Sequence, residues 1–168
     1  MRLDKTKEVL RQYGKYVVQQ SRSRLTKGRN KRTHNATGSL FKSLDYDIQQ
    51  DKDTLSLAFE MNDYGVYLDK GVSGKEKKYK TPFAYTTKKP PMQSLFQWIK
   101  TKRIRFRDSK GKFTRGTYKS IAFVMQNSIY KKGIKPTLFF TKPFEQAFIR
   151  YEKEILNAFL DDAANNLR

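Results

Sequence analysis

A regular alternation of apolar and polar residues over positions 55–61 is the feature that most constrains the fold. The apolar positions are Leu55, Leu57, Phe59 and Met61. Successive side chains of a strand point to opposite faces, so this pattern predicts a β-strand with one face on a core. Tyr46 and Ile48 begin a similar alternation, and the polar run 49–53 can form the turn between the two strands. A small antiparallel sheet is therefore expected.

Segments with helical spacing of apolar residues surround these strands. Helices are predicted over 3–25, 92–102, 121–133 and 143–165, with short helical pieces within 37–44 and 62–71. A polar loop is predicted at 28–35 and a final strand at 135–141. The core stripe of the last helix is expected to be Phe144, Ala147, Phe148, Tyr151, Ile155, Ala158 and Phe159.

The predicted fold class is α+β. A small antiparallel sheet is expected to carry the N-terminal and C-terminal helices packed on it, with long basic loops. The 168 residues are expected to form a single domain, with an extended basic loop and hairpin region at about 72–119.

Positive charge is concentrated in two segments. The chain has 36 Lys and Arg against 16 Asp and Glu, a net charge of +20. Residues 22–42 carry seven basic residues and no acid, and residues 70–119 carry sixteen basic residues against Glu76 and Asp108. Two acid-poor segments in one short chain indicate a shared electrostatic purpose. Nucleic acid and an acidic protein are the two candidate partners, and composition does not choose between them.

The second basic segment contains a predicted hairpin. Basic and apolar residues alternate over 103–107, and Asp108–Gly111 can form the turn. Aromatic residues are interleaved with the cations of this segment at Tyr79, Phe83, Tyr85, Phe106 and Phe113. Such rings can stack on exposed bases. The preferred interpretation is that they anchor the long loops onto the body or onto a neighbouring subunit.

The sequence offers little for catalysis. The absence of cysteine excludes thiolate chemistry, and the single His34 argues against a histidine metal cluster or a hydrolytic triad. The G-x-x-G-K spacing of residues 71–75 is shorter than that of a P-loop. Asp63 and Asp69 are the only plausible start of a magnesium-dependent nuclease. We therefore expect no enzyme, no metal and no cofactor.

No apolar run is long enough to span a membrane, and no basic start is followed by an apolar block. Membrane and secreted locations are therefore not expected.

Three short motifs, taken in order, resemble a known family. They are Thr37-Gly38-Ser39-Leu40 with Ser43-Leu44, then Asp63-Tyr64-Gly65-Val66-Tyr67-Leu68-Asp69-Lys70-Gly71, and Leu138-Phe139-Phe140-Thr141-Lys142-Pro143-Phe144 before a terminal helix. In this order the motifs resemble the neck or tail-completion proteins of tailed bacteriophages, also called tail-component or morphogenesis proteins. The resemblance covers a little over a third of the chain. The sequence departs from the family pattern at Gly65, where alanine is usual, and at Val72, where threonine is usual.

The resemblance implies a structural role in the virion. Members of this family form homo-oligomeric rings in the connector between portal and tail, and the genome passes through the lumen. The implied partners are the portal or an adaptor protein, tail proteins and, without sequence preference, the genomic DNA. The implied location is the head–tail neck of a virion made in the bacterial host cytoplasm.

Two sets of residues are expected to make these contacts. The expected subunit or partner interface comprises Tyr64, Gly65, Tyr67, Leu68, Asp69, Gly71, Phe139, Phe140 and Pro143. The expected contacts to a DNA channel or an acidic partner are Arg29, Lys31, Arg32, Lys75, Lys77, Lys78, Lys80, Lys88, Lys89, Arg103, Arg105, Arg107, Lys112 and Arg115. The alternatives are a sequence-nonspecific nucleic-acid-binding protein with no virion role, and a nuclease that uses Asp63 or Asp69.

Overall fold

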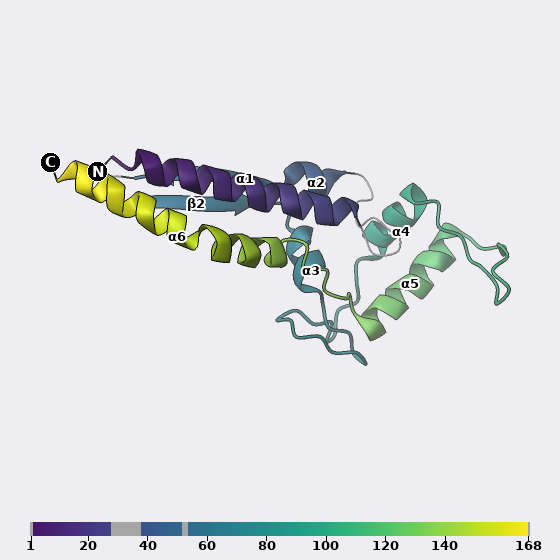
Figure 1. Ribbon diagram of the computed structural model, residues 1–168. Coiled ribbons are helices and arrows are strands. Elements are labelled where there is room, and N and C mark those ends of the chain that lie inside the picture. Colours follow the sequence, from purple (N-terminus) through teal and green to yellow (C-terminus); the bar gives the residue numbers. More distant parts are fainter. Residues whose placement is uncertain (1, 28–37, 52–53, 168) are drawn as a thin grey trace. The chain divides into compact units, whose positions relative to one another are not determined.

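A computed structural model describes residues 2–27, 38–51 and 54–167, and Figure 1 shows their arrangement within each part of the chain. These residues form six helices and one two-stranded antiparallel sheet, which confirms the α+β class. The chain divides into two compact units. We call Met1–Asp63 with Leu138–Arg168 the terminal unit, and Tyr64–Thr137 the central unit. The expected single domain stays a prediction.

The terminal unit contains both ends of the chain. Its elements are α1 (Asp4–Thr26), α2 (Ser39–Ser43), β1 (Asp45–Gln50), β2 (Leu55–Glu60) and α6 (Thr141–Asn166). α1 and α6 lie side by side and run in opposite directions, so that the N and C termini meet at one end of this unit (Figure 1). All five elements match predicted segments.

The hairpin of β1 and β2 has one half-buried and one exposed face. Asp45 pairs with Glu60 and Gln50 with Leu55, so the register places alternate residues on the same face. The half-buried face carries Tyr46, Ile48, Leu55, Leu57 and Phe59, and the exposed face carries Asp45, Asp47, Gln49, Ser56, Ala58 and Glu60. The alternation in the sequence therefore predicted both the strand and its orientation.

Packing of α1 against the sheet depends on one glycine. A Cβ atom at Gly14 would lie 2.5 Å from Cδ2 of Tyr46, so a larger residue there would push the sheet from the helix. The core beside this contact consists of Tyr13 and Val17 of α1 with Ala147 and Tyr151 of α6. The ring of Tyr13 meets the rings of Phe59 and Tyr151 edge-on, with centroids 6.1 and 5.9 Å apart.

The central unit contains α3 (Tyr64–Lys70), α4 (Met92–Thr101) and α5 (Tyr118–Lys132). α4 and α5 pack through Ile99, Ile121 and Ala122, which are all buried. The predicted long loop 72–91 is irregular and is held by the isolated bridges Val72↔Ile134 and Ser73↔Ala84. These helices and this loop were all predicted from the sequence.

The predicted strand at 135–141 is wrong. The described residues 135–141 form no strand. The bridge nearest to them joins Ile134 to Val72, and α6 already begins at Thr141. Pro136 has no N–H to donate to a ladder, and Leu138 adopts a left-handed conformation with φ 51°. The apolar run at 138–140 instead forms the approach to α6, where Phe139 is buried. The loop predicted at 28–35 lies outside the described residues.

Candidate functional site

The positive charge of the chain is concentrated on the central unit. This unit holds 19 Lys and Arg against three acidic residues, a net charge of +16, whereas the terminal unit holds 17 against 13, a net charge of +4. All 19 cations of the central unit are exposed. The second basic segment of the sequence therefore lies within the central unit, whereas the first, residues 22–42, belongs to the terminal unit.

The three acids of the central unit leave this charge largely uncompensated. Glu76 pairs with Lys131 at 3.3 Å, an exposed ion pair that holds the 72–91 loop weakly to the end of α5. Asp69 is buried at 3% exposure. The Asp108 carboxylate accepts hydrogen bonds from the backbone amides of Lys110 and Lys112, both at 2.9 Å. The surface of the central unit is consequently suited to a polyanion.

The predicted basic hairpin is present. Asp108 shapes its turn, Gly111 supplies a positive φ of 80°, and Arg107 bridges to Phe113. The Thr114 amide donates to the Phe106 carbonyl at 3.0 Å, which continues the pairing by one residue on each arm. We call residues 103–115 the arginine hairpin.

An exposed ring beside two guanidinium groups marks the arginine hairpin. Phe113 is 60% exposed, and the guanidinium carbons of Arg107 and Arg105 lie 4.1 and 5.8 Å from its centroid. Cation–π contacts of this kind hold both arginines near one ring. An open hollow of about 640 Å³ is lined by Phe113 and Arg105 together with Arg115 and Tyr118.

The other rings of the basic segment anchor loops, as the sequence analysis preferred. Tyr67 and Phe83 meet edge-on with centroids 4.7 Å apart, and both Phe83 and Tyr85 are half-buried. Burial raises the pKa of Tyr85, and neighbouring Tyr67 adds to this effect. Lys89 donates to Asn127 at 2.9 Å and lies over the ring of Tyr130, so one loop cation is fixed against α5.

The expected polyanion contacts fall into two groups. Arg29, Lys31 and Arg32 lie outside the described residues. The others are all exposed on the central unit: Lys75, Lys77, Lys78, Lys80, Lys88, Lys89, Arg103, Arg105, Arg107, Lys112 and Arg115.

The expected interface residues are divided by burial. Tyr64 and Tyr67 on α3 are 49% and 46% exposed, and Leu68 and Phe140 are half-buried. The remaining residues, Gly65, Asp69, Gly71, Phe139 and Pro143, are buried. The exposed face of α3 is therefore the part of this set that is available to a partner.

Gly71 shows why a motif residue can be buried. Its φ is 74°, and a Cβ atom there would lie 2.6 Å from the carbonyl oxygen of Ile134. The side chain of Thr137 also donates to the Leu68 carbonyl at 2.8 Å. The end of α3 is thus fixed against residues 134–137, which gives this motif a role in the fold of the central unit.

Sequence reasoning missed an apolar face on α6. Ala147, Tyr151 and Ala158 of the expected core stripe are buried, but Phe148 and Phe159 are 50% and 45% exposed. Phe144 of the same expected stripe is 37% exposed, and the other large exposed apolar residues of this helix are Ile149, Leu156 and Leu160. The sequence signal for this face is that the apolar residues of α6 cover a wider arc around the helix than one packed face can bury.

The described residues include no group of three or more His, Cys, Asp or Glu that could hold a metal ion. Asp63 belongs to the terminal unit and is exposed, whereas Asp69 belongs to the central unit and is buried. Within the described ranges, no helix has the length and apolarity to cross a bilayer.

Comparison with known proteins returns no match to a family model, a curated protein or a solved structure.

Proposed function

We propose that this chain is a structural virion protein of a bacteriophage head–tail connector. It acts as one subunit of a homo-oligomeric ring between portal and tail, and the genome passes through that ring. The portal or an adaptor protein and the tail proteins are its neighbours in the proposed assembly. It catalyses no reaction in this role.

One observation carries the proposal: the 19 cations of the central unit are all exposed and face only three acids of the same unit. A ring multiplies this charge by the number of its subunits. Exposed lysines and arginines attract DNA through its phosphates, and phosphate contacts carry no sequence information. DNA can therefore be held in such a channel and still slide.

The motif order supports the same proposal. The segment 63–71 forms α3 and its fixed end, with Tyr64 and Tyr67 exposed for a contact with another chain. The segment 138–144 leads into the long α6, whose exposed apolar residues also favour a partner.

The proposal is tested by the assembly state of the purified protein. Native mass spectrometry at increasing protein concentration should give one discrete multimer, and negative-stain images should show rings with a central channel. A protein that stays monomeric with and without portal and tail components contradicts the proposal.

A sequence-nonspecific nucleic-acid-binding protein with no virion role is the second candidate. The observation in its favour is the exposed Phe113 with Arg105 and Arg107 close to its ring, because an aromatic ring near cations suits a stacked base and its phosphates. This candidate predicts tight, strongly salt-dependent binding of DNA or RNA by the monomer. Weak binding at physiological salt together with ring assembly excludes it.

A further inference from the structure

The open hollow between the arginine hairpin and the start of α5 combines rings with cations. Its volume of about 640 Å³ falls within the range of about 300–1,000 Å³ that is typical of small-molecule sites. Phe113 of the hairpin and Tyr118 of α5 line it, and so do Arg105 and Arg115. None of the described residues that line the hollow is acidic. Aromatic and cationic groups therefore border one space.

The fold does not use Phe113 as an anchor. Ile104 and Phe106 are half-buried and attach the hairpin to the buried cluster of α4 and α5. A Cβ atom at Gly116 would lie 2.5 Å from Cδ2 of Phe106, so the chain passes directly against that ring. Phe113, in contrast, is 60% exposed and lies outside the cluster. Its ring is therefore available to a partner.

The charge around the hollow is not compensated by acids. Residues 100–119 contain nine Lys and Arg against one acid, Asp108, whose carboxylate already accepts two backbone amides in the hairpin turn. α4 and α5 contain no acidic residue. Among the described residues, neither Arg105 nor Arg115 forms an ion pair. The hollow therefore favours an anionic occupant.

The rings indicate which anion fits. An acidic peptide or inorganic phosphate would pair with the arginines but leave the ring of Phe113 uncovered. A nucleotide carries both a phosphate for the guanidinium groups and a flat base that stacks on an aromatic ring. Exposed cations beyond the hollow, at Arg103, Lys110, Lys112 and Lys119, can hold the phosphates of neighbouring nucleotides. These cations favour a strand over a free nucleotide.

The stacking surface favours an unpaired base. The guanidinium carbon of Arg107 lies over the Phe113 ring, 4.1 Å from its centroid, so one face of the ring is already covered. Such a ring is a platform for a single base. In a duplex the faces of each base are stacked on neighbouring base pairs, whereas an unpaired base can leave the stack and lie on a protein ring.

We propose that the hollow holds one unpaired nucleotide of a single-stranded nucleic acid. The base stacks on Phe113, and the phosphates on its two sides lie at Arg105 and Arg115. This site goes beyond the proposed function, in which DNA is held through its phosphates, and it does not require assembly of a ring. It also differs from a general nucleic-acid surface, because it prefers a single strand to a duplex.

Fluorescence anisotropy with two probes tests the site: a short oligothymidine strand and a duplex of the same length. Phe113→Ala should lower the affinity for the strand about tenfold and change the affinity for the duplex by less than about twofold. Phe123→Ala is the matched control, since Phe123 is 55% exposed on α5 and does not line the hollow. This control should bind both probes as the wild type does.

Two further variants separate the ring from the charge. Phe113→Trp keeps a flat ring, so it should keep the affinity for the strand, and its fluorescence should fall as the base stacks. The wild type supplies the baseline, because its single tryptophan, Trp98, does not line the hollow. Arg105→Gln with Arg115→Gln should also weaken binding of the strand, because two phosphate contacts are lost.

Several results would overturn the site. Equal affinity of Phe113→Ala and Phe123→Ala for the strand would show that no base stacks on Phe113. An equal loss for strand and duplex would show that the ring does not distinguish an unpaired base. Thymidine monophosphate that competes as well as the strand would assign the hollow to free nucleotides, and polyglutamate that does so would assign it to an acidic protein.

The ring and this site fail separately. Native mass spectrometry should give Phe113→Ala the same mass as the wild type, because the site takes no part in assembly. A monomeric wild type that still loses strand affinity through Phe113→Ala would refute the ring alone. A ring-forming wild type that does not bind the strand would refute the site alone.

Discussion

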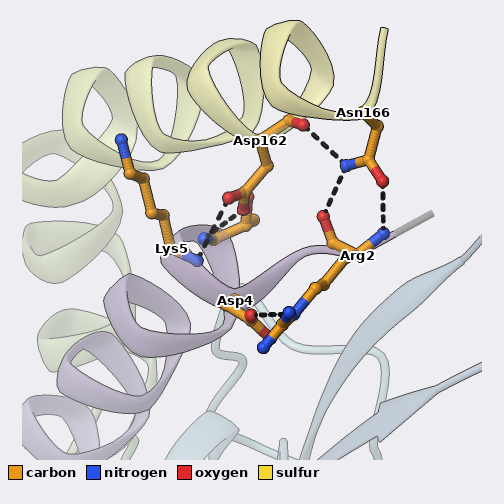
Figure 2. A network of polar contacts seen from close by, with 6 residues as sticks. Arg2, Asp4, Lys5, Asp162 and Asn166 are labelled. Atoms are coloured by element: carbon orange, nitrogen blue, oxygen red, sulfur yellow. Dashed lines mark hydrogen bonds and ion pairs between the residues drawn. The ribbon is translucent and has the colours of Figure 1, made fainter. Parts of the chain in front are cut away.

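The carboxylate of Asp162 near the end of α6 caps the first turn of α1 at Thr6. Its Oδ2 accepts hydrogen bonds from the backbone amide and the side-chain hydroxyl of Thr6, both at 2.8 Å, and Oδ1 accepts one from the Lys5 amide at 3.3 Å. Figure 2 shows this network with Asn166, whose side chain donates to the Arg2 carbonyl and accepts from the Arg2 amide. The first amides of a helix have no partner within the helix, so α6 supplies their acceptors.

Removal of this cap should destabilise the protein. Asp162→Ala leaves the buried amide of Thr6 without its acceptor, and we expect the free energy of unfolding to fall by about 1–2 kcal/mol. Asp161→Ala is the matched control, since Asp161 makes an exposed ion pair with Lys5 at 2.8 Å and should cost at most about 0.5 kcal/mol. Urea titrations of both variants measure the difference. Equal losses would show that Asp162 is no cap.

Acid should weaken the same contact. Burial alone would raise the pKa of Asp162, but the hydrogen bonds from Thr6 and Lys5 outweigh it and lower the pKa below its usual value of 3.8. A lowered folded-state pKa contributes stability above the unfolded value, and that stability is lost as the pH falls through the folded pKa. Unfolding free energies measured from pH 6 down to pH 2 should converge for the wild type and Asp162→Asn. A constant difference across that range contradicts this linkage.

Alkali should act on the core through Tyr13. Burial raises the pKa of Tyr13 from 10.0 to about 12. A raised folded-state pKa contributes stability below the unfolded value, which is lost between pH 10 and about 12. The difference in unfolding free energy between the wild type and Tyr13→Phe should therefore shift in favour of the variant over that range. A difference in unfolding free energy that is independent of pH would mean that folding does not raise the pKa of Tyr13.

Arg103 should be replaceable by glycine with a gain in stability. It follows α4 with φ 50°, while the amides of Arg103 and Ile104 donate to the carbonyls of Lys100 and Ile99, a Schellman ending in which glycine is usual. Arg103→Gly should raise the free energy of unfolding by about 1 kcal/mol because it removes the left-handed strain. Arg103→Ala removes the same side chain but keeps the strain, so it should give no such gain. Thermal unfolding of the two variants separates these effects.

Cations of the central unit should set the salt dependence of DNA binding. Lys75→Gln, Lys77→Gln and Lys80→Gln combined should lower the slope of log K against log salt by about 0.9 for each phosphate contact that is lost. Arg11→Gln, Lys15→Gln and Arg24→Gln on α1 remove the same charge from exposed positions of the terminal unit. Fluorescence anisotropy with a short duplex should show a smaller slope for the first triple variant only. Identical slopes for the two triple variants would contradict a DNA surface on the central unit.

Local patterns predicted most of the fold. The alternation over 55–61 predicted β2 and its faces, and Asp108 with Gly111 predicted the hairpin turn, because the physical cause in each case lies within a few residues. The apolar run at 138–140 misled the prediction of a strand. Pro136 before the run has no N–H for a strand ladder, Leu138 within it adopts a left-handed φ of 51°, and Phe139 packs at the approach to α6.

Long-range relationships were not predictable from spacing. Asp162 and Thr6 are 156 residues apart, and no local pattern in the sequence links them. The exposure of Phe148 and Phe159 likewise depends on how far α1 and the sheet extend over α6. The charged surface was more accessible to prediction, because lysines and arginines without acidic neighbours stay at the surface wherever the chain places them.

The location of the chain in virus particles tests the central claim most directly. Cryo-electron microscopy of purified virions, with antibody fragments bound to this chain, should place the label in a ring on the axis between portal and tail. Label on the capsid shell, along the tail tube, or absent from the particles would contradict the account.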